Sequence, residues 1–288
     1  MNLAQEQLMA SIADQSILIT GAASGIGRLL ATELASKGAK LILWDIQEQA
    51  LSEVAQDLVS RYATTVATYC CDLANPDDIA ACAQKVLIEH PHIDVLVNNA
   101  GVVSGKAFLE LTPAEIQKTF AVNTLALFWT AKAFLPAMVA RNSGHLVTVA
   151  SAAGLIGVAN LVDYSASKFA AVGFDEALRA ELRHLAPGVR TSVICPFFID
   201  TGMFAGVHTR FPWLLPILSQ NHVAKRIAKV IEKRQPRLYL PPLVHIIAPA
   251  RLLPLRLFDT IAEILGINQS MHHFTGRPPT KPRPEADN

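Results

Sequence analysis

The chain has 288 residues, of which 51% are apolar and 17% charged, and its formal net charge is +1 at pH 7. This length fits one large domain or two small ones, and a nearly balanced charge without a basic, aromatic groove argues against nucleic-acid binding. No uninterrupted run of eighteen apolar residues occurs, so no membrane-spanning helix is expected, and the polar residues 1–15 predict neither a secretory signal nor an apolar anchor.

Apolar runs typical of buried strands recur along the chain, with helical patterns between them. The expected strands are 16–20, 40–44, 65–70, 93–97, 144–149, 189–195 and 237–240. The expected helices are 25–37, 47–61, 76–89, 112–140 and 163–186. Alternation of this kind indicates an α/β fold, a doubly wound parallel sheet of about seven strands with helices on both faces. We find no internal repeat or linker before residue 205, so we expect a single domain over residues 16–241.

A glycine-rich loop, residues 21–27 (GAASGIG), follows the first expected strand and precedes the first expected helix. Its glycines let the backbone turn tightly and approach a pyrophosphate, and the helix N-terminus offers unpaired N–H groups and a partial positive charge. The spacing is G-x-x-x-G-x-G. A plain turn is the alternative, but the position between strand and helix predicts a nucleotide-binding site.

The second expected strand ends at Asp45. A carboxylate at this point can accept hydrogen bonds from an adenosine ribose and would repel a ribose phosphate by like charge. No Arg or Lys lies in the glycine loop before Gly27 or just after Asp45. Asp45 therefore favours NAD over NADP, with a turn or N-cap Asp as the alternative interpretation.

Tyr164 lies four residues before Lys168 in the fifth expected helix, and Ser151 lies thirteen residues before Tyr164. Residues four apart share one face of a helix. A fixed positive charge favours the phenolate, so we expect Lys168 to lower the pKa of Tyr164 from the ordinary value of about 10. Most such pairs are exposed helix residues; a nucleotide loop in the same domain favours a proton-handling site instead.

The C-terminal third differs from the rest in charge and composition. Residues 1–205 carry 13 Lys/Arg and 19 Asp/Glu, a net of −6, whereas residues 206–288 carry 12 and 5, a net of +7, and hold 11 of the 17 prolines. A basic, apolar, proline-broken extension suits a membrane surface, or it caps the active site; both interpretations remain open. We expect residues 242–288 to form a C-terminal extension and the last dozen residues to be disordered.

The cysteines and histidines carry no metal or disulfide pattern. No Cys-x-x-Cys pair occurs, so we expect free thiols in a reducing compartment and no bound metal. The four cysteines are Cys70, Cys71, Cys82 and Cys195.

Further motifs follow the glycine loop and Asp45 in chain order. They are Cys71-Asp72-Leu73, Asn98-Asn99-Ala100-Gly101, Asn123, Ser151, Tyr164 with Lys168, Pro196 and Thr201. This ordered set resembles the short-chain dehydrogenase/reductase family from residue 16 to about 240, and the resemblance implies a Rossmann fold. Residues 43–46, 201–204 and 265–271 further resemble the epidermal retinol dehydrogenases and the lipid-droplet 17β-hydroxysteroid dehydrogenases, whose members typically start with a membrane anchor.

The resemblance also implies a role for each matching residue. The implied catalytic residues are Asn123, Ser151, Tyr164 and Lys168. The implied cofactor-binding residues are Gly21, Ser24, Gly25, Ile26, Gly27, Asp45, Ile46, Asp72, Leu73, Asn99, Ala100, Gly101, Tyr164, Lys168, Pro196, Ile199 and Thr201. The expected substrate contacts are Ser151, Tyr164, Phe197 and Phe198. The family places its substrate-closing segment after Thr201, so residues 204–234 would close over the substrate. Tyr164 would exchange the proton of an alcohol, Ser151 would hydrogen-bond its oxygen, and Asn123 would hold a water that links Lys168 to solvent. The family usually has Pro-Gly where this chain has Pro196-Phe197, a departure that favours an apolar substrate.

We therefore expect an NAD-dependent oxidoreductase that interconverts a bulky apolar alcohol (a retinoid, steroid or long-chain alcohol) and its aldehyde or ketone. The alternatives are a 3-oxoacyl thioester reductase of the same fold that uses NADPH, a nucleotide-sensing protein, and a peripheral membrane-binding module. We expect a cytoplasmic protein, with membrane association if the extension binds lipid. Helices 112–140 and 163–186 are candidates for a homodimer or homotetramer interface, with ordinary packing on the sheet as the alternative.

Overall fold

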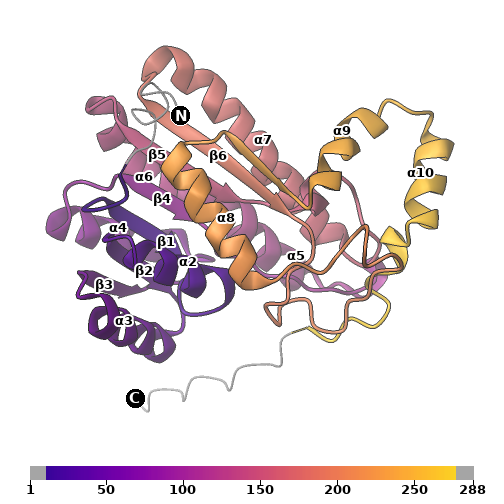
Figure 1. Cartoon of the computed structure of the whole chain (residues 1–288), viewed down its shortest axis with the longest axis horizontal. Coiled ribbons are helices and arrows are strands. Elements are labelled where there is room, and N and C mark those ends of the chain that lie inside the picture. The colour runs from indigo at the N-terminus through magenta and orange to yellow at the C-terminus, as the bar shows by residue number, and fades with distance from the viewer. Residues whose placement is uncertain (1–10, 277–288) are drawn as a thin grey trace.

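A computed structural model describes residues 11–276, and all seven expected strands form in it (Figure 1). They are β1 (Ser16–Thr20), β2 (Lys40–Asp45), β3 (Val66–Cys70), β4 (Val95–Asn98), β5 (Gly144–Val149), β6 (Val189–Pro196) and β7 (Arg237–Leu240). Every neighbouring pair is parallel, in the order β3-β2-β1-β4-β5-β6-β7. This confirms the doubly wound sheet. The strand order reverses between β1 and β4, and in such sheets the ligand crevice lies at the carboxyl ends of the strands at that point.

Helices cover both faces of the sheet. They are α2 (Gly25–Ala35), α3 (Glu48–Tyr62), α4 (Pro76–Glu89), α5 (Pro113–Phe120), α6 (Ala126–Ala140), α7 (Val162–Leu185) and α8 (Gln220–Lys233). The expected helix over 112–140 is divided by a π-helical turn, η2 (Ala121–Leu125). Helix α8 was not among the sequence predictions, which assign its residues to a substrate-closing region.

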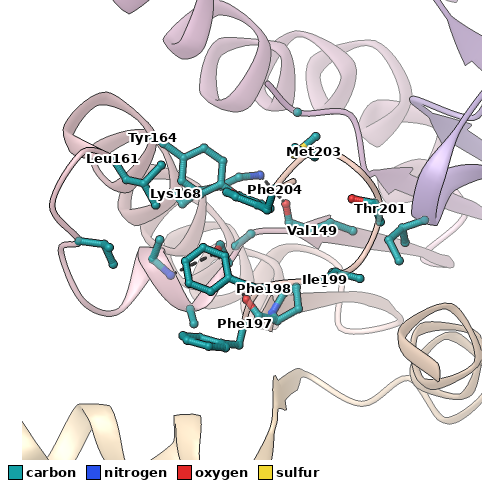
Figure 2. A pocket seen from close by; sticks show the side chains of 18 of the residues that line it. Val149, Leu161, Tyr164, Lys168, Phe197, Phe198, Ile199, Thr201, Met203 and Phe204 are labelled. Atoms are coloured by element: carbon teal, nitrogen blue, oxygen red, sulfur yellow. Dashed lines mark hydrogen bonds between the residues drawn. The ribbon is translucent and has the colours of Figure 1, made fainter. Parts of the chain in front are cut away.

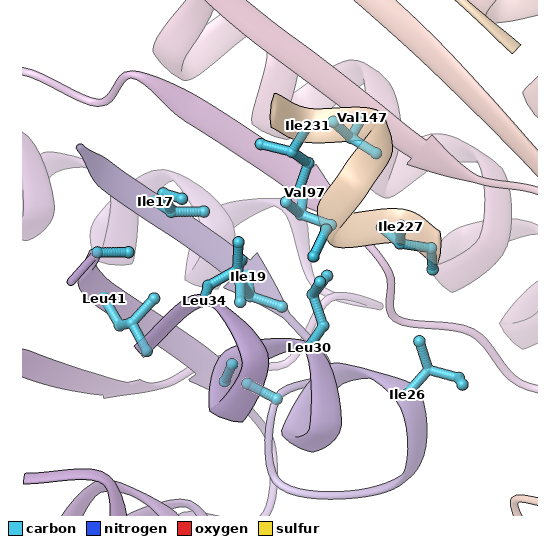
Figure 3. Close-up of a cluster of buried hydrophobic side chains, with 14 of the residues drawn as sticks. Ile17, Ile19, Ile26, Leu30, Leu34, Leu41, Val97, Val147, Ile227 and Ile231 are labelled. Carbon is cyan, nitrogen blue, oxygen red and sulfur yellow. The ribbon is translucent and has the colours of Figure 1, made fainter. Parts of the chain in front are cut away.

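The alternation of side chains along β1 explains the two layers. Ile17 and Ile19 point to the face covered by α2, α3 and α8, where they pack with Leu30 and Ile227 (Figure 3). Leu18 points to the opposite face, under α4, α6 and α7. Successive residues of a strand alternate between faces, so an unbroken apolar run is what a sheet buried on both sides requires.

On the second face, Trp44 of β2 and Phe134 of α6 meet edge to face, with ring centres 5.8 Å apart. Within residues 11–276, the helical run Pro113–Ala140 is by length and composition apolar enough to cross a membrane. The expectation of no membrane-spanning helix rests on the lack of an uninterrupted apolar run and remains a prediction. Phe134 and Met138 of this run are nevertheless fully buried in the core beneath the sheet, a position typical of a core helix.

After β7 the chain leaves the sheet and builds a separate edge of the molecule. Its elements are η4 (Pro242–Ile246), α9 (Ile247–Ala250), α10 (Leu255–Ile264) and η5 (Ile267–Gln269). Figure 1 shows α9 and α10 projecting from the body at the right. The segment after η5 returns to the body, where the Phe274 ring occupies the space above Gly105 and the Thr275 amide donates to the Ala205 carbonyl oxygen at 2.9 Å. The expectation of disorder for the last dozen residues concerns residues 277–288, which lie outside the described range.

Candidate active site

The glycine loop connects β1 to α2 through a backbone shape that favours glycine at two points. Gly21 and Gly25 have φ angles of +67° and +53°, in the left-handed region. A Cβ atom at Gly27 would clash with the carbonyl oxygen of Gly21 and lie 2.7 Å from Nδ2 of Asn99. The loop therefore packs tightly against its own helix, and the backbone at the α2 N-terminus remains open toward a ligand.

Asn99 holds this loop against the end of β4. Its Nδ2 donates to the carbonyl oxygens of Thr20 at 2.9 Å and Gly21 at 3.2 Å. In the other direction, the backbone amides of Asn99 and Ala100 donate to Oγ1 of Thr20 at 3.0 and 3.1 Å. These four bonds join the ends of β1 and β4, where the strand order reverses.

Asp45 lies at the carboxyl end of β2 and is buried. Its carboxylate accepts hydrogen bonds from the backbone amides of Ala23 at 2.9 Å and Gln47 at 3.0 Å. The side chain is thus fixed beside the glycine loop with further lone pairs available. Asp72, after β3, is oriented in a similar way by the amide of Ala74 at 2.9 Å. Both carboxylates line the cavity, on the side of the glycine loop.

Tyr164 and Lys168 lie on the first turns of α7, and both side chains are almost fully buried. Nζ of Lys168 lies 5.7 Å from the centre of the Tyr164 ring and donates to the Val149 carbonyl oxygen at 2.9 Å. Burial raises the pKa of Tyr164 to about 12, and a hydrogen bond with Ser151 opposes that rise. The lowering of the Tyr164 pKa that was expected from Lys168 is not found in the protein alone: burial raises this pKa, and Ser151 is the group that opposes the rise.

Lys168 is itself affected by burial, which lowers the pKa of its ammonium group to about 8. The residue that faces it is Gly101, where an added Cβ would lie 3.5 Å from Nζ and 3.3 Å from Oδ1 of Asn123. A side chain at Gly101 would thus crowd the ammonium. The absence of a side chain at Gly101 leaves room for a ligand beside Lys168.

Ser151 begins a short 3-10 turn, η3 (Ala152–Gly154), which fixes its rotamer. Oγ accepts from the Ala153 amide at 3.1 Å and donates to the Pro196 carbonyl oxygen at 3.4 Å. The long bond to Pro196 is one that a ligand oxygen can replace, because hydrogen bonds weaken with distance.

Asn123 lies in the π turn η2 and does not reach the cavity surface. Oδ1 of Asn123 accepts a hydrogen bond from the Val102 backbone amide at 2.8 Å, and Nδ2 of Asn123 donates one to the Val102 carbonyl oxygen at 2.9 Å. Nδ2 also contacts Oγ of Ser167 at 3.0 Å. Single π turns inside helices occur frequently at functional sites. Here the turn places Asn123 behind Gly101 and Lys168, and the expected water relay through Asn123 remains a prediction.

An aromatic group lines the site beyond Tyr164. The Phe204 ring meets Tyr164 edge to face at 5.7 Å and Phe198 at 5.2 Å, and Phe198 meets Phe197 at 4.7 Å (Figure 2). Phe197 and Phe198 were expected to contact substrate. Phe204 was not, although its place three residues after Thr201 in the substrate-closing region is a usable signal. The rings give the space next to Tyr164 an apolar wall.

One cavity of about 550 Å³ connects the glycine loop, Tyr164 and the C-terminal extension. It is lined by all the predicted site residues except Gly27 and Asn123, which support the lining from behind. The extension contributes a set of lining residues that the sequence reasoning did not identify: Leu243, Val244, Ile246, Ile247, Ala250, Phe258, Ile261, Ala262, Leu265 and Ile267. The interpretation of this segment as a cap over the active site therefore agrees with its position.

The fold and the cavity together define a class. A loop built for a pyrophosphate at the switch point of a parallel sheet, opening onto a buried tyrosine and lysine, fits an oxidoreductase that binds a nicotinamide dinucleotide and acts on a CH–OH group.

The chain belongs to the short-chain dehydrogenase family, whose model, described as short chain dehydrogenase, matches residues 15–210. It is 43% identical over 269 residues to epidermal retinol dehydrogenase 2 of Mus musculus, covering 93% of this chain and 87% of the relative. It is 42% identical over 268 residues to short-chain dehydrogenase/reductase family 16C member 6 of Bos taurus, covering 92% and 85%. These similarities place it in the retinol dehydrogenase branch and support an oxidoreductase of CH–OH donors.

A solved structure with a similar fold is the short chain dehydrogenase/reductase from Burkholderia phymatum in complex with NAD. Its TM-score is 0.76 at 27% identity, covering 96% of this chain and 99% of that one. Another is a metagenomic short-chain oxidoreductase in complex with NADP, with a TM-score of 0.67 at 30% identity, covering 80% and 97%. Relatives of this fold thus bind one or the other of the two dinucleotides.

Proposed function

We propose that the protein is an NAD-dependent oxidoreductase that interconverts a bulky apolar alcohol, such as a retinoid, steroid or long-chain alcohol, and its aldehyde or ketone. The observation that carries the proposal is the apolar wall that runs from Tyr164 through Phe204 and Phe198 to the C-terminal extension. An alcohol that reaches Tyr164 through such a wall gains free energy by leaving water, about 25 cal/mol for each Å² of apolar surface buried. A small polar alcohol gains little.

Each residue of the proposed catalytic site would have a separate role. A bound nicotinamide dinucleotide would supply or accept the hydride. Tyr164 would donate its proton to the carbonyl oxygen in reduction and take the alcohol proton in oxidation. Ser151 would hydrogen-bond the same oxygen as its charge changes. Lys168 would stabilise the anionic form of Tyr164 and bind the dinucleotide, and Asn123 would hold the π turn behind them.

The residues that would hold the dinucleotide occupy one side of the cavity. The glycine loop would bind the pyrophosphate, Asp45 the adenosine ribose, Asp72 and Leu73 the adenine, and Ile199 and Thr201 the nicotinamide end. All of these residues lie before position 242. We therefore assign residues 16–241 to the catalytic domain and residues 242–288 to the extension.

The preference for NAD rests on the charge of Asp45. The carboxylate is fixed next to the glycine loop by two backbone amides, so a ribose phosphate would meet an unpaired negative charge. Asp45→Asn should raise kcat/KM with NADP relative to NAD by about tenfold, an effect of roughly 1.4 kcal/mol. Asp57→Asn, which removes a half-buried carboxylate that pairs with Arg61 on α3, is the matched control. A wild-type enzyme that prefers NADP would contradict the assignment.

Substrate class is tested by a panel of retinol, hydroxysteroids, fatty alcohols, small polar alcohols and 3-oxoacyl thioesters, each with both dinucleotides. We expect kcat/KM to rise with the apolar surface of the substrate. Activity confined to 3-oxoacyl thioesters with NADPH would instead indicate the thioester reductase of the same fold.

Assembly and location are part of the same proposal. Helix α6 and the turn before it leave Leu125, Phe128 and Trp129 about two-fifths exposed, which supports a homodimer or homotetramer through this surface. The mass of the protein in solution, measured by light scattering, tests it. We place the protein in the cytoplasm with a peripheral membrane contact through the extension, because an apolar alcohol partitions into lipid.

A further inference from the structure

The C-terminal extension exposes an unusual number of large aliphatic side chains. We define the outer hairpin as residues 247–264, which comprise α9, a turn and α10. Leu252 in the turn is 88% exposed, and Leu255 at the start of α10 is 73% exposed. Leu253, Leu257 and Ile264 are also exposed. Scattered apolar side chains on a surface are normal, but a contiguous group marks a contact with a partner or a membrane.

The other side of the outer hairpin faces the active-site cavity. Phe258 and Ala262 line the cavity from α10, Leu265 lines it just after the end of α10, and Ile247 and Ala250 line it from α9. Ile261 both lines the cavity and is 39% exposed, and Ile246, just before the hairpin, is 56% exposed and also lines it. These two residues therefore lie at the mouth of the cavity, next to the exposed leucines.

The outer hairpin is attached to the body of the protein. Nη1 of Arg251 donates to the Leu155 carbonyl oxygen at 3.1 Å, and its guanidinium lies 5.1 Å from the centre of the Phe169 ring. At the far end of α10, Nη1 of Arg210 donates to the Ile264 carbonyl oxygen at 3.2 Å. Arg210 belongs to the loop that also carries Trp213, which is 81% exposed. Exposed tryptophans of this kind are enriched at the interface between membrane and water.

We propose that the exposed leucines of the outer hairpin dock the protein on a lipid bilayer, so that an apolar substrate passes from the bilayer into the cavity past Ile246 and Ile261. This inference rests on the proposed function for its substrate class. A second protein copy on the same surface would cover the mouth, whereas a bilayer covers it with the phase in which the substrate is dissolved.

The charge of the outer hairpin determines the kind of lipid surface. The hairpin carries two arginines, Arg251 and Arg256, and two acids, Asp259 and Glu263, so its formal charge is zero. Many of the other positive residues of the basic third lie on α8, which packs against α2 on the sheet (Figure 1). Binding should therefore depend on apolar burial, and it should need no anionic lipid and persist at high salt.

The test is flotation of the full-length protein with vesicles of pure phosphatidylcholine, at low and high salt. The wild type should float with the vesicles under both conditions, and Leu252→Glu with Leu255→Glu should reduce the bound fraction by at least about tenfold. Ile88→Glu, which changes an exposed isoleucine on α4, is the matched control and should float like the wild type. Dinucleotide binding measured on each variant reports that the fold is intact.

Flotation requires no turnover, so its result is independent of whether the proposed substrate class is correct. The proposal is overturned if the wild type stays unbound, if it binds only to anionic vesicles at low salt, or if the double variant floats normally. A double variant that loses a dimer in solution, with no vesicle binding by the wild type, would assign the surface to a second copy and would also overturn it.

Discussion

Lys168 lies beside Tyr164, with Nζ 5.7 Å from the ring centre, but gives its hydrogen bond to the backbone carbonyl oxygen of Val149. Burial then drives both side chains toward their neutral forms, raising the pKa of Tyr164 to about 12 and lowering that of Lys168 to about 8. The phenol of Tyr164 is therefore protonated at neutral pH in the protein alone, the form that can donate a proton.

Tyr164→Phe removes the phenol oxygen and keeps the ring that meets Phe204 edge to face. We expect kcat/KM to fall by roughly 10²- to 10⁴-fold, the usual contribution of a general acid or base. Dinucleotide affinity, measured by calorimetry, should change little. Tyr62→Phe on α3 is the control and should leave both quantities unchanged. Substantial residual turnover by Tyr164→Phe would remove Tyr164 from its assigned role.

Lys168→Met should lower activity and raise stability at neutral pH. The folded pKa of about 8 lies below the ordinary 10.5, so between these values the unfolded chain binds more protons, and the free energy of unfolding rises with pH across that window. Below pH 8 the penalty for burying the charge is fully present, at up to about 3 kcal/mol. The variant lacks this penalty, although it also loses the bond to Val149.

The measurement for Lys168→Met is urea unfolding at pH 7, 8.5 and 10, expressed as variant minus wild type. The subtraction is needed because burial raises the pKa of the Cys71 and Cys195 thiols, which lowers stability at alkaline pH. A difference that does not shrink as pH rises from 8 to 10.5 would show that the ammonium is not the source of the penalty.

His145 of β5 should make the protein acid-labile. Nε2 of His145 lies 2.7 Å from Oγ of Ser192, which itself donates to the Gln235 carbonyl oxygen, so Nε2 carries the proton. Nδ1 is buried without a hydrogen-bond partner among the described residues, and burial lowers the His145 pKa from 6.5 to about 3. In this range the imidazole of His145 is protonated in the unfolded chain but not in the folded protein. The free energy of unfolding therefore falls as pH drops from about 6.5 to 3.

The expected loss from His145 is about 3 kcal/mol at pH 4. His145→Gln keeps a donor for Ser192 and has no proton to gain, so its stability should exceed that of the wild type at pH 4 by more than at pH 7. The comparison with the variant matters because burial raises the pKa of Asp175 to about 6, which stabilises the folded state as pH falls. Parallel pH profiles of the two proteins would refute the prediction.

Gly27→Ala should damage the dinucleotide site, because the added Cβ would clash with the Gly21 carbonyl oxygen that Asn99 holds in place. We expect dinucleotide affinity to fall by at least about tenfold, or roughly 1.4 kcal/mol. Gly173→Ala on α7 is the matched control, since nothing lies within 4 Å of its added Cβ, and it should stabilise the protein by up to about 1 kcal/mol. Equal affinities of the two variants would contradict the tight packing of the loop.

The strands and the dinucleotide loop could be predicted because their signals are local. Each buried strand is a short apolar run, and the glycine loop lies between strand and helix. Helix α8 is also within reach, since Val223, Ile227 and Ile231 follow helical spacing. The helix is not predicted because residues 204–234 are assigned as a whole to a substrate-closing region.

The remaining features depend on distant contacts. The pKa of Tyr164 is set by how deeply the fold buries it, which spacing to Lys168 does not reveal. The cap over the cavity depends on where residues 243–267 lie relative to Phe204, and no periodicity encodes that. The roles assigned to Asn123, Ser151, Tyr164 and Lys168 remain predictions that the variants above test.

The contact of Phe274 with Gly105 has a consequence for the order in which the protein becomes functional. The glycine loop, Asp45 and Asn99 all lie within the first hundred residues, whereas the ring that packs above Gly105 and the buried Met271 come close to the end of the described chain. During synthesis on a ribosome, the chain up to Asn99 is made long before the ring that packs above Gly105. A chain released before residue 274 would keep Phe198 and Phe204 but would lack the Phe274 ring that contacts both Gly105 and Phe204.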